Sequence, residues 1–231
     1  MSVWLITGAS RGFGLEIDRE ALNRGDSVVA TARNPQTVLD ALPDAGDRLV
    51  AVGLDVSDAD QARAAVDTAV ARFGRIDVLV NNAGVMPVGP FLEQSEQAIR
   101  TAVEVNLHGV LTGCRLVLPE MVERRSGHIV NIASVAGLVA VPGQVVYAGT
   151  KFAVVGLSSA LADEFAKKRA AKTWKPEEFR KEVARVIGLP GEIPTAKVTE
   201  IGAGNGERIK IERQCFDTGA GVPLPALPLS P

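Results

Sequence analysis

Residues 7–14 read Thr7-Gly8-Ala9-Ser10-Arg11-Gly12-Phe13-Gly14, directly after the apolar stretch 3–6 and at the start of a helical pattern over 13–24. Gly8 suits a sharp turn off a strand, and the two later glycines let a ligand approach the backbone without a Cβ clash. The helix that follows points its free N–H groups and positive dipole end at an anion. This placement favours a pyrophosphate-binding turn over an ordinary glycine turn. The residues expected to line it are Gly8, Ser10, Arg11, Gly12, Phe13 and Gly14.

Short apolar runs alternate with helical patterns along most of the chain. Strands are predicted over residues 3–6, 27–31, 49–54, 78–80 and 128–132, and helices over 13–24, 58–73, 95–124 (as two helices) and 147–169. Runs that are apolar throughout are typical of parallel strands buried on both faces. The alternation therefore predicts an α/β protein, a Rossmann-like, doubly wound parallel sheet in a three-layer α/β/α domain.

The composition excludes several classes of function. A chain of 231 residues with 46% hydrophobic residues and a net charge of −2 is expected to form one domain, without a nucleic acid or an anionic membrane as partner. Cys114 and Cys215 lie far apart, and with only two histidines, His108 and His128, no metal site is expected. The isolated thiols, the missing secretory signal and the absence of a 20-residue apolar run predict a cytoplasmic protein.

The end of the second predicted strand bears on the choice of nucleotide. A carboxylate is expected there when the ribose 2′-hydroxyl is bound, but the sequence is Ala30-Thr31-Ala32-Arg33. Arg33, with Arg11 from the glycine turn, can instead hold a 2′-phosphate through guanidinium forks. The alternative is that both arginines are merely solvated. We predict NADP(H) in preference to NAD(H).

A proton-transfer pair is predicted on the last helical pattern. Tyr147 and Lys151, four residues apart, project from the same helical face. An ammonium group beside a phenol favours the phenolate, so the tyrosine can act as general acid in a reduction or general base in an oxidation. Ser134, just after the fifth predicted strand, can donate a hydrogen bond to a substrate oxygen that gains negative charge. A Tyr-xxx-Lys pair alone also arises by chance on amphipathic helices.

With Asn81-Asn82-Ala83-Gly84 after the fourth predicted strand, these motifs have the order and spacing of the short-chain dehydrogenase/reductase family, which the chain resembles from about residue 3 to 165. The resemblance implies a homodimer or homotetramer, and makes Asn106 a fourth catalytic residue. It also implies that Tyr147 and Lys151 contact the cofactor. Further cofactor contacts implied by the resemblance are Asp55, Val56, Asn82, Ala83, Gly84, Pro190, Gly191, Ile193 and Thr195. The chain departs from the family pattern at Gly149 and Thr150, where the family has Ala and Ser.

The last third of the chain departs further. A sixth strand is expected at 183–189 after a basic insertion at 170–182, and the best candidate for a last strand is 207–211. We therefore place the cofactor-binding domain, with its substrate loop, at 1–200, and an irregular Gly/Pro-rich segment, partly disordered in expectation, at 201–231.

The predicted function is hydride transfer between NADP(H) and a carbonyl or secondary alcohol. The expected pocket rims, 85–91 and 135–145, are apolar and favour a hydrophobic substrate, although the same residues could simply pack against a helix. The alternative function is an NADP(H)-binding protein with little or no catalysis, such as a sensor.

Overall fold

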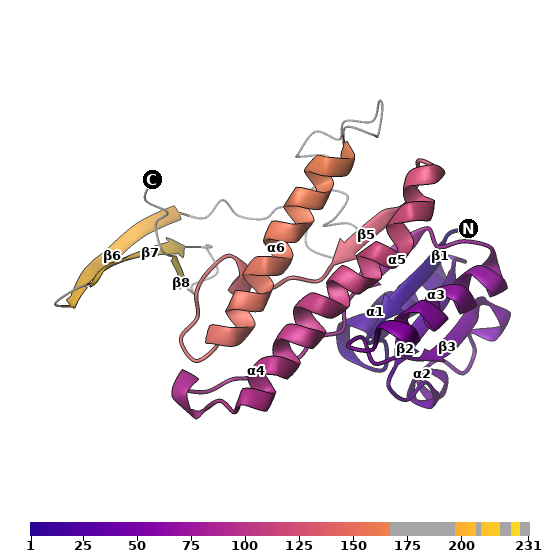
Figure 1. Cartoon of the computed structure of the whole chain (residues 1–231), viewed down its shortest axis with the longest axis horizontal. Helices are drawn as coiled ribbons and strands as arrows, with labels where there is room; N and C mark the ends of the chain where they lie inside the picture. Colours follow the sequence, from indigo (N-terminus) through magenta and orange to yellow (C-terminus); the bar gives the residue numbers. More distant parts are fainter. Residues whose placement is uncertain (167–196, 207–208, 218–222, 227–231) are drawn as a thin grey trace.

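The computed structural model describes residues 1–166, 197–206, 209–217 and 223–226. Its main sheet contains β1 (Val3–Thr7), β2 (Ser27–Ala32), β3 (Leu49–Gly53), β4 (Val78–Asn81) and β5 (His128–Asn131). All neighbouring strands are parallel, in the order β3-β2-β1-β4-β5 (Figure 1). The chain reverses its direction of winding between β1 and β4, and this is where open α/β sheets bind ligands.

Helices cover both faces of this sheet. On one face, α1 (Gly12–Asn23) and α2 (Gln36–Ala41) pack against the apolar cluster around Ile6, Val28 and Val80. On the other face, α3 (Ala59–Phe73) and α5 (Gly109–Glu123) pack against Leu5, Val29 and Leu79. The side chains of β1 alternate between these two cores, which explains why the central strands are apolar on both faces.

The last helix among the described residues is α6 (Val145–Ala166), which lies beside α5 (Figure 1). Val154 packs against Val110 and Cys114 of α5. By length and composition alone, Val145–Phe165 is also apolar enough to cross a membrane, with a mean hydropathy of 1.5. In this fold, however, the same helix packs on α5 and buries Lys151.

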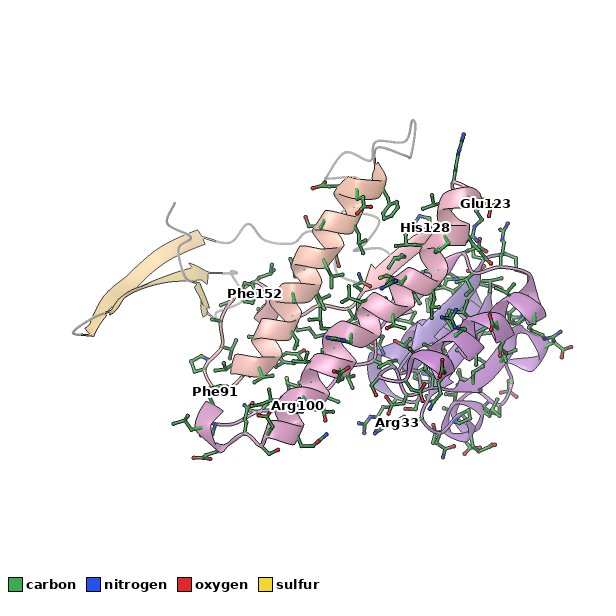
Figure 2. All side chains as sticks on the ribbon, in the orientation of Figure 1. Arg33, Phe91, Arg100, Glu123, His128 and Phe152 are labelled. Atoms are coloured by element: carbon green, nitrogen blue, oxygen red, sulfur yellow. The ribbon has the colours of Figure 1, made fainter. Side chains whose placement is uncertain are left out.

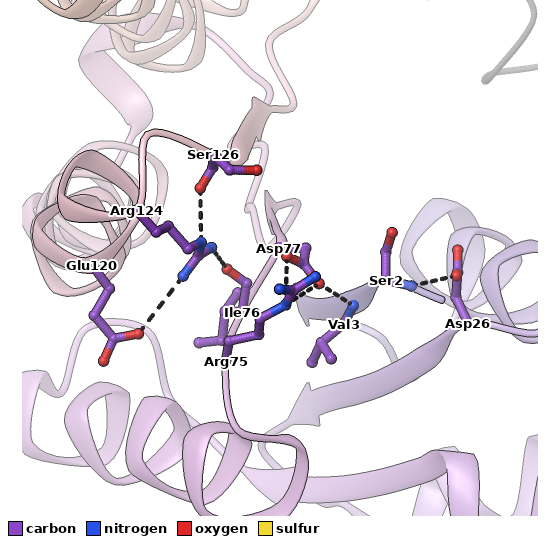
Figure 3. A network of polar contacts seen from close by, with 9 residues as sticks. All are labelled: Ser2, Val3, Asp26, Arg75, Ile76, Asp77, Glu120, Arg124 and Ser126. Atoms are coloured by element: carbon purple, nitrogen blue, oxygen red, sulfur yellow. Dashed lines mark hydrogen bonds and ion pairs between the residues drawn. The ribbon is translucent and has the colours of Figure 1, made fainter. Parts of the chain in front are cut away.

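The amino ends of the strands are held by a polar network, shown in Figure 3. The Asp77 carboxylate accepts a hydrogen bond from the Val3 N–H at 2.9 Å and pairs with Arg75 at 3.0 Å. The Arg124 guanidinium donates to the Ile76 and Ser126 carbonyl oxygens. The network ties the end of α5 to the start of β4, and it leaves the carboxyl ends of the strands for the loops that carry the candidate site.

Helix α4 (Glu96–Val103) and α5 form one continuous rod interrupted by a π-helical turn, η3 (Glu104–His108). Ser95 begins α4 by accepting a hydrogen bond from the Ala98 N–H at 3.1 Å. The sequence predicts two helices over this range, and the structure joins them by a turn that contains Asn106. A single π turn inside a helix is frequently found at a functional site.

The described C-terminal strands form a second sheet. β6 (Lys197–Gly206), β7 (Ile209–Asp217) and β8 (Pro223–Ala226) are antiparallel, in the order β6-β7-β8. The expectation that 207–211 is the last strand of the main sheet is therefore wrong, because Ile209–Asp217 pairs with the neighbouring β6. Two extended segments joined by a short connection can pair directly as a hairpin. Where an irregular segment is expected at 201–231, the described residues 201–206, 209–217 and 223–226 form strands; a domain division at 200 stays a prediction.

The parallel sheet with helices on both faces confirms the predicted fold class, and each of the five predicted strands corresponds to an observed one. The six-residue α2 is missing from the prediction. The expected sixth strand at 183–189 and the insertion at 170–182 lie outside the described residues.

Candidate active site

The glycine turn is held against the end of β4 by close backbone contacts. Gly8 has φ +68°, and a Cβ placed there would lie 2.8 Å from the Ala83 Cα. A Cβ on Gly14 would lie 2.5 Å from the Gly8 oxygen and 2.6 Å from the Asn82 Nδ2. The Asn82 amide donates to the Thr7 and Gly8 oxygens at 2.9 and 3.1 Å. Any larger side chain at Gly8 or Gly14 would push α1 away from the sheet.

The amino end of α1 is open to an anion. The helix starts at Gly12, its first turn has no acidic side chain, and Arg11 before it makes no side-chain hydrogen bond to the helix. No described atom lies within 4 Å of a Cβ placed on Gly12, and Phe13 beside it is 62% exposed. Ser10 is half-buried in the same turn. Free N–H groups, a positive dipole end and an adjacent guanidinium suit a pyrophosphate.

Arg33 and Asp55 lie close together at the carboxyl ends of β2 and β3. The Ser57 hydroxyl and N–H donate to Asp55 at 2.6 and 3.0 Å. These bonds, with a smaller contribution from the charge of Arg33, lower the pKa of Asp55, so it is a carboxylate at neutral pH. Val56, next along the chain, is partly buried against Leu54 and Leu116. Arg33 itself is exposed at the rim of the main domain (Figure 2).

Lys151 anchors the centre of the site. It is 4% exposed, and its ammonium donates to the Ile132 carbonyl oxygen at 2.6 Å. The same Nζ lies 5.8 Å from the ring centroid of Tyr147, one helical turn earlier on α6. Burial lowers the pKa of Lys151. The expected proximity of phenol and ammonium is thus present, and the lysine is held by the segment that follows β5.

Ser134 begins the short 3-10 turn η4 (Val135–Gly137), two residues after Ile132. Its Oγ accepts a hydrogen bond from the Ala136 N–H at 3.1 Å. Because that bond uses an oxygen lone pair, the hydroxyl proton stays available as a donor. A Cβ on Gly137 would lie 2.7 Å from the Lys151 carbonyl oxygen, so η4 packs directly on the middle of α6.

Asn106 is fully buried at the junction of three segments. Its Oδ1 accepts from the Val85 N–H at 2.8 Å, and its Nδ2 donates to the Val85 oxygen at 2.8 Å and to the Thr150 hydroxyl at 3.1 Å. A Cβ on Gly84 would lie 3.3 Å from this Oδ1 and 3.8 Å from the Lys151 Nζ. Asn106, Gly84 and Lys151 are therefore neighbours in space.

The described residues fit a nicotinamide dinucleotide, NAD(H) or NADP(H), on these observations. Tight loop packing at Gly8 and Gly14 leaves the face at Gly12 open, which gives the backbone cradle that a pyrophosphate needs. Asn82 and Ala83 lie against that turn, Gly84 follows them beside Asn106 and Lys151, and Arg33 is exposed after β2. Pro190, Gly191, Ile193 and Thr195 lie outside the described residues.

Sequence reasoning missed two hydroxyl groups that build this site. The Thr7 Oγ1 accepts from the Asn82 and Ala83 N–H groups at 3.0 Å each, and so joins β1 to the loop after β4. For Thr7 the sequence did offer a signal, because it is a threonine at the carboxyl end of a strand, directly before the glycine turn. The Thr150 hydroxyl donates to the Tyr147 carbonyl oxygen at 2.7 Å while it accepts from Asn106.

Comparison with known proteins agrees with this geometry. Residues 2–172 match the family model for short chain dehydrogenases. The oxidoreductase BOA17 of Botryotinia fuckeliana (strain B05.10) is 42% identical over 165 residues, which are 71% of this chain and 60% of BOA17. The chain thus spans less than two thirds of the length of that relative.

Two similar solved structures contain nucleotides. A short-chain dehydrogenase/reductase of Burkholderia phymatum in complex with NAD is 35% identical, with a TM-score of 0.69 over 72% of this chain and 60% of that one. The closed form of a serine dehydrogenase complexed with NADP+ is also 35% identical, with a TM-score of 0.68 over 71% of this chain and 66% of that one. With the family match over most of its length, this chain belongs to the short-chain dehydrogenase/reductase family.

Proposed function

We propose that the chain is an NADP(H)-dependent oxidoreductase that interconverts a hydrophobic carbonyl compound and the corresponding secondary alcohol. The observation that carries this proposal is the pairing of Tyr147 and Lys151 on one face of α6, with the buried ammonium 5.8 Å from the phenol ring. The Ser134 turn packs against the same part of the helix. These groups supply a proton donor, a nearby cation and a hydrogen-bond donor around one position.

NADP(H), when bound, supplies or accepts the hydride, and the chain supplies the proton and the positioning. In the reduction, Tyr147 would give its phenolic proton to the substrate oxygen. The Lys151 ammonium stabilises the phenolate that remains. The Ser134 hydroxyl donates to the same substrate oxygen, where negative charge develops. In the oxidation the Tyr147 phenolate would take one proton from the substrate hydroxyl.

The preference for NADP(H) rests on Arg33 and Arg11. Arg33 is exposed at the carboxyl end of β2, beside the ionised Asp55, and Arg11 adjoins the open end of α1. A guanidinium group at each of these two places suits a 2′-phosphate, which carries more charge than the 2′-hydroxyl of NAD(H). The nucleotide complexes of the relatives include both NAD and NADP+, so the choice depends on these side chains.

The hydrophobic substrate class rests on exposed apolar side chains in the two expected rims. On the loop after β4, Met86 is 55% and Val88 63% exposed, and Leu138 after η4 is 67% exposed. Side chains of this kind bind apolar groups and offer no counter-charge to a polyanion.

The proposal includes a cytoplasmic homodimer or homotetramer, with no nucleic acid or membrane as partner. Val145 and Phe152 are 52% and 45% exposed on α6, and Phe152 lies on the side of α6 turned away from α5 (Figure 2). Apolar side chains on one helix face suit a contact with a second copy of the chain. Light scattering of wild type and Phe152→Asp tests this part, since a monomeric wild type would contradict it.

The experiment for the reaction is NADPH consumption with a panel of hydrophobic ketones and aldehydes. We expect the wild type to reduce at least one member, and Tyr147→Phe to lower kcat/KM by about a hundredfold or more, the contribution of a general acid. The alternative function is an NADP(H)-binding protein without turnover, and the sequence feature that favours it is the departure of the last third of the chain from the family pattern. NADPH binding with no reduction above the Tyr147→Phe background would establish that alternative.

A further inference from the structure

Thr150 is buried in α6, between the two members of the proposed proton-transfer pair. Its hydroxyl donates to the Tyr147 carbonyl oxygen at 2.7 Å. Since the proton is used there, the oxygen meets Asn106 as an acceptor, and the Asn106 Nδ2 donates to it at 3.1 Å. The hydrogen bonds therefore have a fixed direction, from Asn106 to Thr150 and from Thr150 to the helix backbone.

The other side of the Asn106 amide is joined to Val85. The amide accepts from the Val85 N–H and donates to the Val85 oxygen, both at 2.8 Å, as a neighbouring strand would. A flipped amide would place its NH₂ group against the Val85 N–H, and its oxygen against the Val85 carbonyl. The two bonds to Val85 thus fix the orientation of the Asn106 amide, and the remaining N–H of the Asn106 Nδ2 points to Thr150.

This chain of bonds crosses the site. Val85 starts the apolar rim at residues 85–91, and Tyr147 lies on the turn of α6 that ends at Lys151. The connection passes through the Thr150 hydroxyl, and Asn106 is 0% exposed, so solvent does not replace the bond when the hydroxyl is removed.

We propose that Thr150 is a positioning residue that acts through the Asn106 amide to fix the rim at Val85 relative to the turn of α6 carrying Tyr147 and Lys151. The hydroxyl itself touches no reacting atom. Its effect on turnover rests on the proposed oxidoreductase function, whereas the link to Val85 is independent of that function.

The test compares Thr150→Val, which keeps the shape and removes the hydroxyl, with Thr150→Ser, which keeps the hydroxyl. Thr68→Val is the matched control, because the Thr68 hydroxyl likewise bonds its own helix, to the Ala64 oxygen at 2.7 Å, on the exposed side of α3. Thr150→Ala provides a second hydroxyl-free variant if the valine does not fit. The first readout is hydrogen exchange of the Val85 amide, with peptides from β1 and β2 as internal reference.

We expect Thr150→Val to speed exchange at Val85 by about tenfold, the factor for one neutral hydrogen bond, with no change in the reference peptides. Thr150→Ser should recover most of the protection, and Thr68→Val should leave it unchanged. The second readout is turnover: kcat/KM should fall about tenfold in Thr150→Val and return in Thr150→Ser. The turnover is measured at saturating NADPH, so that a change in cofactor affinity does not enter this readout.

Equal exchange at Val85 in Thr150→Val and Thr150→Ser would overturn the link itself. Faster exchange with unchanged kcat/KM would overturn the positioning role. If the wild type reduces no substrate, the proposed function fails, and the exchange data alone then decide whether Thr150 holds Val85 through Asn106.

Discussion

Replacing Asp18 is expected to stabilise the protein, and increasingly so as the pH rises. Asp18 lies on the face of α1 that packs on the sheet, with Gly14, Ala21 and Leu22. It is 0% exposed, and neither carboxylate oxygen has a hydrogen-bond partner among the described residues. Burial without compensation raises the pKa of Asp18 from 3.8 to about 8. A carboxyl group in this position opposes folding whenever the unfolded chain would ionise it.

The size of the effect follows from that difference in pKa. Unfolded, Asp18 loses its proton near pH 3.8, whereas the folded chain keeps it up to about pH 8. Between these values the native state binds the extra proton, so the free energy of unfolding falls by about 1.4 kcal/mol for each pH unit. Below pH 3.8 the Asp18 carboxyl is protonated in both states and does not lower the free energy of unfolding. Above about pH 8 it is ionised in both states, and the full loss of stability is present. Over that interval the loss is about 6 kcal/mol, comparable with the net stability of many domains.

The assay is urea unfolding of wild type, Asp18→Asn and Asp18→Ala at pH 5, 6, 7 and 8. Neither variant can ionise at this position, so the stability of each relative to wild type should rise by about 4 kcal/mol between pH 5 and pH 8. Asn keeps the volume of the side chain, and Ala removes its polar atoms. If wild type and both variants show the same dependence on pH, the carboxyl does not stay protonated in the folded protein, and the reasoning is wrong.

The other predictions concern the cofactor, the lysine and the attachment of α6. Arg33→Asp should weaken NADPH binding by about tenfold to a hundredfold, because a charge-assisted contact is lost and a second carboxylate is placed beside Asp55; equal weakening of NADH binding in fluorescence titrations would refute it. Lys151→Met should lower kcat/KM for ketone reduction by about a hundredfold while the chain stays folded, and steady-state rates close to wild type would show that the ammonium is not needed. The Asn131 amide donates to the Ser158 hydroxyl at 2.9 Å across β5 and α6, so Ser158→Ala should lower the free energy of unfolding by about 1 to 2 kcal/mol, and an unchanged urea midpoint would contradict this.

The main sheet was predictable because burial on both faces leaves a simple signature. Residues such as Val28, Val29 and Ala30 are apolar in succession, and all three are fully buried in β2. The glycine turn was equally predictable from the sequence, since the positive φ of Gly8 and the close backbone approach at Gly14 exclude most other residue types at these two positions. In both places a local pattern and its tertiary environment demand the same residue types.

The π turn around Asn106 was not predictable from periodicity. An added residue within a helix shifts the 3.6-residue pattern only slightly, and the reason for the turn is the pairing of Asn106 with the distant Val85. The role of Thr150 was hidden for the same reason, because its partner Asn106 lies 44 residues away. Contacts between distant segments decide these features, and no local pattern in the sequence encodes them.

At the C-terminal strands, the sequence predicted an extended segment but not the strand with which it pairs. Residues 207–211 were the best match to a final strand by position, but Ile209 pairs with Gly206 in a hairpin of the second sheet. A strand pattern shows that a segment is extended, without identifying its partner. The sixth strand expected at 183–189 and the cofactor contacts expected at 190–195 lie outside the described residues, so they stay predictions.

Deuterium transfer from NADPH that carries deuterium at both positions of the nicotinamide C4 tests the proposed reaction most directly. The best ketone of the panel is incubated with wild type and with Tyr147→Phe, and the product alcohol is analysed by mass spectrometry. With Tyr147 as proton donor, wild type should place the deuterium on the former carbonyl carbon, and Tyr147→Phe should bind NADPH equally well but form product at least about a hundredfold more slowly. Product without deuterium, or product formed as fast by Tyr147→Phe as by wild type, would contradict it.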